Sequence, residues 1–165
     1  MFITICRKNE VYQVSNDHKI SHIISTLDPG DSIRAPSYIK DHLLLTFDDI
    51  EYAADKYSPK AEHVAEILEW SSQLAPSDRL LVHCWAGVSR STALGLAIWI
   101  QHHGRDYAAA KEWLVSTRPI ACPNRLIAEY ADEILGCDGK LSEIAEEVGN
   151  YRLIRNLANL AEDAD

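Results

Sequence analysis

The chain has 165 residues, a length that indicates one domain large enough to bury a hydrophobic core. Hydrophobic residues make up 47% of it, which excludes an intrinsically disordered chain. The formal net charge of -9 argues against a general nucleic-acid-binding surface, because such surfaces need clustered cations. The first residues lack the pattern of a signal peptide, and no apolar run approaches the roughly 18 residues of a membrane span. We therefore expect neither a nucleic-acid nor a membrane partner.

The four cysteines are scattered and show no spacing typical of a metal site; they are Cys6, Cys84, Cys122 and Cys137. Such a pattern suits free thiols in a reducing compartment better than a disulfide scaffold. The sequence therefore predicts a cytoplasmic protein that needs no metal and no other cofactor.

The first half of the chain alternates predicted strands and helices. Short runs rich in β-branched and aliphatic residues predict buried strands at residues 2–6, 22–26, 42–47 and 79–84. The turn sequence LDPGD follows the second run. An amphipathic pattern predicts a helix over residues 58–74, with Ser58 as its N-cap and Pro59 at its first position.

The second half is predicted to be entirely helical. A mostly apolar pattern over residues 91–104 indicates a central helix that Gly104 ends. Two more helices are predicted, over 106–119 with Asp106 as a cap and over 124–136 with Asn124 as a cap. Two shorter helical patterns and a frayed acidic tail from about residue 155 follow. The whole predicts a single α/β domain over residues 1–165, with three layers and a central, mostly parallel sheet flanked by helices.

The stretch VHCWAGVSRS places Cys84 at the end of a predicted strand and Arg90 at the start of a predicted helix. A loop of this kind turns successive backbone N–H groups toward one point, at the positive end of a helix, and so forms an anion site. It would stabilise a thiolate, and Arg90 would hold two phosphate oxygens at once. Gly87 would allow a ligand to approach the backbone, and Ser91 could donate a hydrogen bond to the sulfur. The alternative is a buried structural thiol beside an unrelated arginine.

This stretch resembles the signature of the cysteine-dependent protein phosphatases, in which His-Cys is followed by five residues, Arg, and then Ser or Thr. The Ser-Arg-Ser at residues 89–91 is most similar to the dual-specificity branch. The resemblance implies a catalytic role for Cys84, Arg90 and Ser91. It also implies a phosphate-binding loop made of Trp85, Ala86, Gly87, Val88, Ser89 and Arg90.

The same resemblance implies roles for residues outside the loop. The family takes a proton from an aspartate after an earlier strand, and Asp48 and Asp49 both follow the predicted strand 42–47. We favour Asp49, because alternation along the strand leaves it as the first residue free to project from the loop. His83 is expected to brace the loop without acting as a base or metal ligand. Asn124 is expected to brace the loop as well as to cap its helix.

The resemblance implies a phosphatase that hydrolyses phosphotyrosine, and also phosphoserine and phosphothreonine where the pocket is shallow. The loop has no lysine between Cys84 and Arg90, which favours phosphoproteins over phosphoinositides as substrates. The alternative function is a phosphate-binding regulatory or scaffolding module with weak or no catalysis. Cys122 lies two residues before Asn124, so it is either a small buried thiol or a partner for oxidised Cys84 in a protective disulfide.

Overall fold

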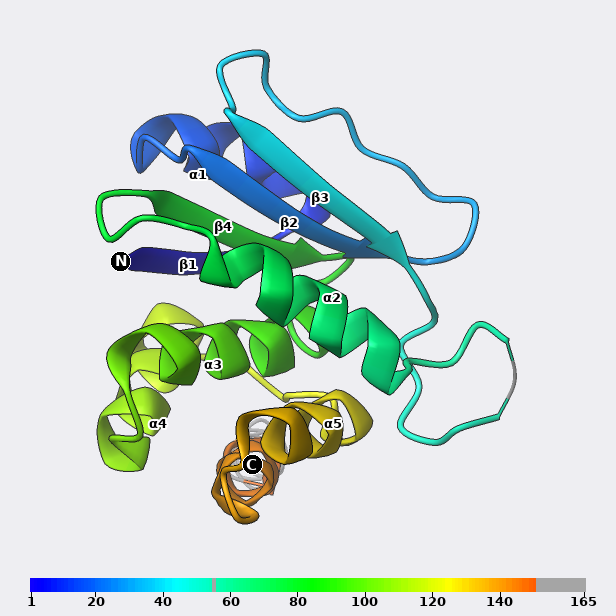
Figure 1. Cartoon of the computed structure of the whole chain (residues 1–165). Helices are drawn as coiled ribbons and strands as arrows, with labels where there is room; N and C mark the ends of the chain where they lie inside the picture. The colour runs from blue at the N-terminus through cyan, green and yellow to red at the C-terminus, as the bar shows by residue number, and fades with distance from the viewer. Residues whose placement is uncertain (55, 151–165) are drawn as a thin grey trace, which may run out of the picture.

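One parallel sheet forms the centre of the protein (Figure 1). The computed structural model describes residues 1–54 and 56–150. Its strands are β1 (Phe2–Arg7), β2 (His22–Leu27), β3 (Asp41–Thr46) and β4 (Arg79–Cys84), and they lie side by side in the order β1-β4-β2-β3. All neighbouring pairs are parallel, and Arg7, Thr26 and Cys84 share one level of the register. The carboxyl ends of all four strands therefore meet at one edge of the sheet.

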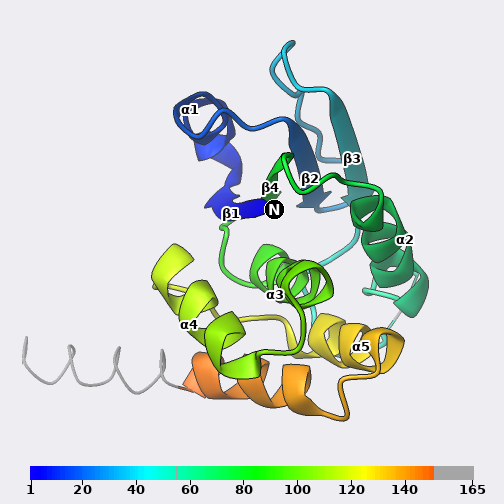
Figure 2. The ribbon, with the colours of Figure 1, turned by 60° about the vertical axis from the view of Figure 1, so that its left-hand side comes forward.

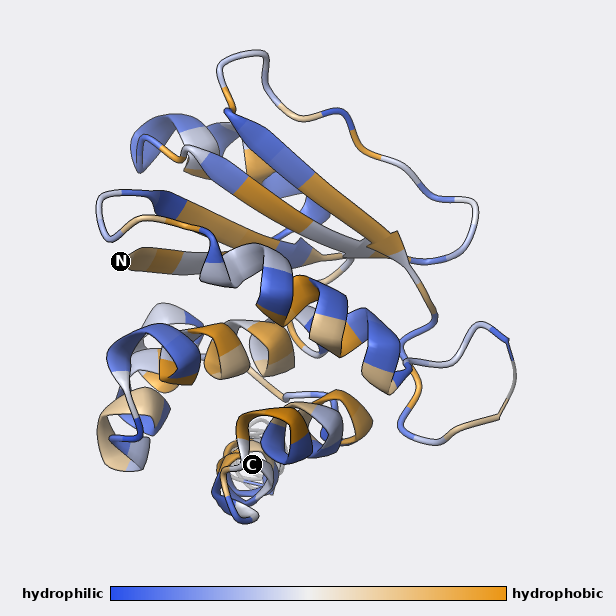
Figure 3. Cartoon of the chain, viewed as in Figure 1, coloured by the Kyte–Doolittle hydropathy of each residue, from blue (hydrophilic) through white to orange (hydrophobic). Residues whose placement is uncertain are grey.

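Helices cover both faces of the sheet. The 3-10 turn η1 (Lys8–Glu10) and α1 (Val11–Asp17) lie on one face, over a small apolar cluster that includes Val11, Ile23 and Leu81. The other helices lie on the opposite face, over the larger core (Figures 1 and 2). All six residues of β2 are buried, because this inner strand is covered on both sides. Hydrophobic residues gather along the strands and on the helices beside them (Figure 3).

The central helix is α3 (Arg90–His103), which packs against strands β1, β2 and β4 and against three helices. These are α2 (Ala61–Ser72), α4 (Tyr107–Thr117) and α5 (Arg125–Leu135). Residues 140–150 are helical as well, and the Asp132 carboxylate accepts hydrogen bonds from Gly139, Leu141 and Ser142 at their start. Helix α3 also packs against β4, and both elements are largely buried, so the loop between them is held at both ends.

The predicted fold class is confirmed: an α/β domain with a central parallel sheet and a helical C-terminal half. The predicted strands lie within a residue or two of β1–β4. Asp106 and Asn124 cap their helices by accepting hydrogen bonds from Ala109 and Ile127, as predicted. Gly136 ends α5 in the left-handed conformation. Of the two shorter helical patterns near the C-terminus, the first falls within helical residues 140–150. The rest of that region, with the tail from about residue 155, lies outside the described residues.

Two local predictions were wrong or incomplete. Helix α2 begins at Ala61 with Lys60 as its N-cap, so Ser58 and Pro59 precede the helix. The Ser58 hydroxyl instead accepts a hydrogen bond from the Ala54 backbone N–H, and so closes a turn before the helix. Helix α1 was not predicted, because only Val11 and Ser15 of its seven residues are buried and its periodic signal is short.

Within the described residues, no helix is long and apolar enough to cross a membrane.

Candidate active site

The candidate site lies where the parallel strands end. Asp28 directly follows β2, and Cys84 ends β4. Asp48 and Asp49 come after β3 with only Phe47 between the strand and Asp48. The backbone N–H of Phe47 still donates to Leu27 O at 3.0 Å, so strand pairing extends one residue past β3. This edge is where α/β proteins generally bind ligands, because side chains and helix N-termini from several elements converge there.

The thiol of Cys84 is buried at this edge and touches the first turn of α3. Its Sγ lies 3.2 Å from the Ser91 Oγ, and either atom can donate the hydrogen bond. Ser91 is itself fully buried, so its hydroxyl is fixed beside the sulfur. The structure thus brings together Cys84 and Ser91 as the signature predicts.

The loop of residues 85–89 turns its carbonyl groups away from the site. Trp85 O accepts from the Lys8 N–H at 3.1 Å, Val88 O from the Cys122 N–H at 2.8 Å, and Ser89 O from the Asn124 N–H at 3.3 Å. Arg118 donates from Nε to Gly87 O at 2.8 Å and from Nη2 to Ala86 O at 3.2 Å.

The carbonyl groups of the loop accept hydrogen bonds, whereas most of its backbone N–H groups do not donate any within the described part of the chain. Those of residues 86–89 donate to no acceptor among the described residues. Buried or partly buried N–H groups are normally paired, so a row of free N–H groups beside a thiol indicates an anion site.

Gly87 is required by the packing of the loop against β1. Its φ is +65°, and a Cβ at this position would lie 2.6 Å from the carbonyl carbon and oxygen of Cys6. The structure shows a close approach to the neighbouring strand, and the close approach of a ligand to Gly87 stays a prediction. The backbone of β1 cannot move aside cheaply, because it is paired with β4 along its whole length.

We expect Gly87→Ala to lower the free energy of unfolding by about 2–4 kcal/mol, because it adds both a clash and an unfavourable backbone conformation. The displaced loop should also reduce turnover of a phosphate monoester by at least ~10²-fold. Gly30→Ala is the matched control: Gly30 has a φ of +88° but nothing within 4 Å of its Cβ position. It should cost about 1 kcal/mol and leave turnover unchanged. Urea unfolding and steady-state assays of both variants give the comparison, and equal effects would contradict the steric argument.

Arg90 is buried with part of its guanidinium still free. Its Nη1 donates to Phe47 O at 2.6 Å and its Nη2 lies 2.8 Å from an Asp28 carboxylate oxygen. The side chain of Arg90 is only 2% exposed, whereas that of Asp28 is 50% exposed. The Nε atom is buried and has no hydrogen-bond partner among the described residues. An Asp49 carboxylate oxygen lies 3.7 Å from Nε, too far for a hydrogen bond, so this edge of Arg90 faces an anionic group and still has an unused donor.

Asp49 lies against the same loop. Its Oδ1 accepts from the Ser89 hydroxyl at 2.6 Å and from the Asn124 side-chain amide at 2.9 Å. Its Oδ2 lies 3.7 Å from the Nε of Arg90. Asn124 also donates to Ile50 O at 3.0 Å, while its own oxygen caps α5. Asn124 thus ties the aspartate loop to the start of α5. Asp48 has its backbone N–H directed to Tyr57 O at 2.8 Å.

His83 is fully buried behind the loop, and burial lowers its pKa to about 4, so the ring is neutral at pH 7. Its Nε2 lies 2.5 Å from the Ser25 Oγ, and Ser25 Oγ also lies 2.7 Å from Nε2 of His42. Its Nδ1 lies 3.4 Å from Cys84 O. One consistent assignment has His42 donating to Ser25, Ser25 to His83, and His83 to Cys84 O. The ring therefore links the end of β4 to the neighbouring strand β2.

Sequence reasoning missed three residues of the site. Asp28 pairs with Arg90, Arg118 holds two carbonyls of the loop, and Ser25 bridges two histidines. Asp28 lies in the LDPGD segment, whose pattern predicts only a turn. Its position directly after a parallel strand was a usable signal, whereas nothing local in the sequence marks Arg118 or Ser25.

Two further cysteines, Cys6 and Cys122, lie near the loop. Cys6 is buried on β1, and burial raises the pKa of its thiol to about 12, which marks it as a structural thiol. Cys122 is partly buried, and its backbone holds the loop through Val88. All four thiols are free, and a disulfide between Cys84 and Cys122 stays a prediction.

Sequence comparisons find known phosphatases among the proteins that this chain is similar to. No protein-family model matches the chain. The chain is 32% identical over 107 residues to dual specificity protein phosphatase MPK-4 of Drosophila melanogaster. The matched residues make up 64% of this chain and 27% of that protein. It is 39% identical over 70 residues to human dual specificity protein phosphatase 18, and the matched residues make up 42% of this chain and 34% of that protein. The chain thus spans about a quarter to a third of the length of these relatives.

Structural comparisons show the same fold in the same group of proteins. Human DUSP28 has a TM-score of 0.63 at 18% identity, over 81% of this chain and 94% of that one. The human tyrosine phosphatase-like serine/threonine/tyrosine-interacting protein has a TM-score of 0.60 at 22% identity, over 80% of this chain and 86% of that one. These structures show the fold alone, and the sequence matches to proteins named dual specificity protein phosphatases confirm the resemblance that the signature gives to the dual-specificity branch of the cysteine-dependent protein phosphatases.

Proposed function

We propose that the chain is an active phosphoprotein phosphatase that hydrolyses phosphate monoesters through a cysteinyl-phosphate intermediate. The observation that carries the proposal is the pairing pattern of the loop after Cys84. Its carbonyls are bound by surrounding segments, while the N–H groups of residues 86–89 have no acceptor among the described residues. Preorganised donors of this kind stabilise the negative charge of a phosphoryl group without reorganising during the reaction.

In the proposed first step, the thiolate form of Cys84 attacks the phosphorus atom of the monoester through Sγ. A sulfur–phosphorus bond forms as the bond from phosphorus to the ester oxygen breaks, and Asp49 gives its proton to the leaving oxygen. The free N–H groups of the loop and the Nε edge of Arg90 hold the three other oxygens. Asp49 is near enough for this role, since its carboxylate already contacts Ser89 and approaches Arg90.

In the proposed second step, water attacks the phosphorus atom of the intermediate. The sulfur–phosphorus bond breaks, the electron pair returns to Cys84, and the water proton passes to Asp49, which restores the acid. Ser91 donates to the departing sulfur from a hydroxyl that lies 3.2 Å away. Atoms and charge therefore balance over the cycle without a further reactant, and inorganic phosphate is released.

We assign His83 a positioning role within this scheme. A ring with a pKa of about 4 carries no proton to give at neutral pH, and it is buried behind the loop. Its contacts with Ser25 and with Cys84 O fix the backbone that presents the thiol. Asn124 acts similarly on the aspartate loop through its bonds to Asp49 and Ile50.

The proposed substrates are phosphoproteins, with phosphotyrosine as the first class to test. The names of the relatives support phosphoserine and phosphothreonine as further substrates. The signature loop has no lysine to meet the extra phosphates of an inositol ring. A binding module without catalysis is less well supported, because thiol, arginine and carboxylate all lie at the site. A single domain over residues 1–165 and a cytoplasmic location stay predictions.

Hydrolysis of p-nitrophenyl phosphate by the full chain tests the proposal. We expect turnover that iodoacetamide abolishes, with inorganic phosphate slowing the inactivation because it occupies the same site. Mass spectrometry should locate the protected alkylation at Cys84, not at the partly buried Cys122. Phosphate binding without any turnover would contradict the proposed enzyme and favour the binding module.

A further inference from the structure

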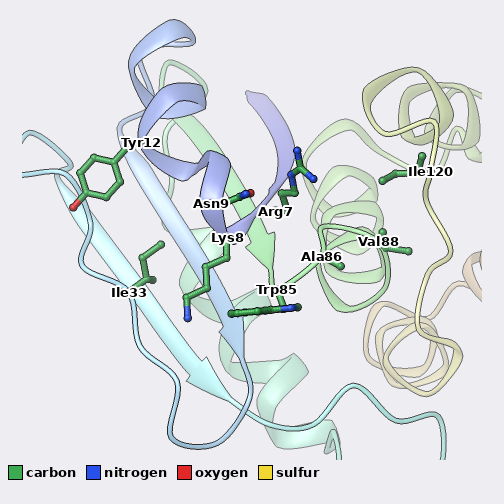
Figure 4. Close-up of a pocket in the computed structure, with 9 residues that line it drawn as sticks. All are labelled: Arg7, Lys8, Asn9, Tyr12, Ile33, Trp85, Ala86, Val88 and Ile120. Carbon is green, nitrogen blue, oxygen red and sulfur yellow. The ribbon is translucent and has the colours of Figure 1, made fainter.

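A cavity of about 850 Å³ opens beside the signature loop (Figure 4). Trp85, Ala86 and Val88 of the loop form part of its wall, and segment 7–12, the loop after β2 and the turn before α5 form the rest. The other lining residues are Arg7, Lys8, Asn9, Tyr12, Ile33 and Ile120. A volume of this size lies in the range of ligand sites and exceeds what one phosphate needs.

The wall of this cavity is largely apolar, although it is open to solvent. Tyr12 and Trp85 are each 56% exposed and Ile120 is 46% exposed, which places them among the exposed large hydrophobic residues of the described chain. Ile33 and Val88 add aliphatic surface between them (Figure 4). Clusters of exposed apolar side chains around a hollow typically mark a binding site.

The cations at the cavity are already paired. Lys8 Nζ lies 3.1 Å from an Asp31 carboxylate oxygen and 4.8 Å from the centre of the Trp85 ring. Arg7 Nε lies 2.9 Å from a Glu10 carboxylate oxygen. These pairs leave little unpaired charge to attract an acidic group, so apolar contact is the main recognition that the cavity offers. The Lys8 contact also fixes the Trp85 ring at the border between cavity and loop.

We propose that this cavity binds an apolar side chain of the phosphoprotein substrate, one or two residues away from the phosphorylated residue. The proposal rests on the proposed function, because the occupant must be attached to the phosphate that Cys84 attacks. Three lining residues belong to the loop between Cys84 and Arg90, and Lys8 is bonded to Trp85 O. Neighbouring Cα atoms are about 3.8 Å apart, so the Cα of a residue one or two positions from the phosphorylated residue lies within about 8 Å of the Cα of that residue. Its side chain can therefore reach a cavity whose wall includes the loop that holds the phosphate.

Synthetic phosphotyrosine peptides test the proposal. The set keeps one sequence and places leucine or alanine at each of the two positions before and after the phosphotyrosine. We expect kcat/KM to be about tenfold higher for leucine than for alanine at one of these positions, because the alanine peptide leaves apolar surface uncovered. Turnover of p-nitrophenyl phosphate is measured in parallel. If it is absent, the proposed function fails; if it is present without a leucine preference, only the cavity proposal is overturned.

Variants of the wall tie the preference to the cavity. Ile120→Ser and Ile33→Ser should each reduce the leucine-to-alanine ratio of kcat/KM to about threefold or less. Ile134→Ser is a matched control, because Ile134 is an isoleucine of α5 that is 43% exposed and does not line the cavity. The ratio is taken within each variant, so a general loss of activity does not affect it. An unchanged ratio in both wall variants would overturn the proposal.

A lipid chain is the competing occupant. Vesicles of phosphatidylcholine that contain a phosphorylated lipid, assayed beside the peptides, separate the two. Faster hydrolysis of that lipid than of every peptide, with no leucine preference, would assign the cavity to an acyl chain and contradict the proposal. Slower hydrolysis of the lipid, together with the leucine preference, supports it.

Discussion

Replacing Cys84 by serine should abolish turnover of p-nitrophenyl phosphate while an oxyanion such as vanadate or phosphate still binds. A serine hydroxyl is a far weaker nucleophile than a thiolate in this loop, so we expect kcat to fall by at least ~10⁴-fold. The free N–H groups of residues 86–89 and the Nε of Arg90 remain in place, because none of them depends on the sulfur. Steady-state kinetics and calorimetric titration with phosphate measure the two effects separately.

Cys122→Ser is the control for this substitution. Cys122 contacts the loop only through its backbone N–H to Val88 O among the contacts of the described residues, and serine preserves that bond. We expect its turnover to equal that of the parent under reducing conditions. Turnover of Cys84→Ser within tenfold of the parent would overturn the covalent mechanism. Loss of phosphate binding in Cys84→Ser would show instead that the loop needs the thiol for its shape.

The parts of the site that the sequence predicts well are contiguous in the chain. Cys84, the loop and Arg90 span one strand end, one turn and one helix start, and each has a local signal. The caps Asp106 and Asn124 are equally local, because a cap bonds to an N–H three residues away. Such features depend on a few neighbouring residues, so a single sequence is enough to place them.

The parts that the sequence does not predict depend on contacts between distant segments. Arg118 reaches the carbonyls of residues 86 and 87 from the end of α4, and Asp28 reaches Arg90 from the end of β2. Neither contact follows from spacing, since it requires the order β1-β4-β2-β3 and the path of the connecting turns. The start of α2 was misplaced for a related reason: the Ser58 hydroxyl, a plausible cap on sequence grounds, is used by Ala54 in the preceding turn.

The cavity beside the loop illustrates the same limit. Tyr12 and Ile120 are isolated apolar residues in the sequence, more than a hundred positions apart. Each by itself is an ordinary exposed hydrophobic residue and needs no explanation. They gain significance only because η1 and α1 follow β1 at the same sheet edge as the loop after β4. The signature therefore predicts the reaction, whereas the cavity proposed to give specificity is lined by residues from several parts of the chain.

Replacing Asp49 by asparagine should lower kcat by about 10²–10⁴-fold for a substrate with a poor leaving group, such as an alkyl phosphate. Asparagine has no proton to give to the leaving oxygen, yet it can keep the hydrogen bond that Asp49 accepts from Ser89. The loss should shrink for p-nitrophenyl phosphate, whose leaving group needs little protonation.

Asp48→Asn is the matched control, one residue earlier in the same loop. The backbone N–H of Asp48 donates to Tyr57 O, and this bond survives the substitution, so kcat should stay within a few-fold of the parent. The leaving-group dependence separates acid catalysis from a structural effect, because a displaced loop would slow both substrates equally. A large loss in Asp48→Asn with a mild one in Asp49→Asn would move the role to Asp48. Mild effects in both would contradict an aspartate acid in this loop, although Asp49 alone of the pair bonds to Ser89 and Asn124.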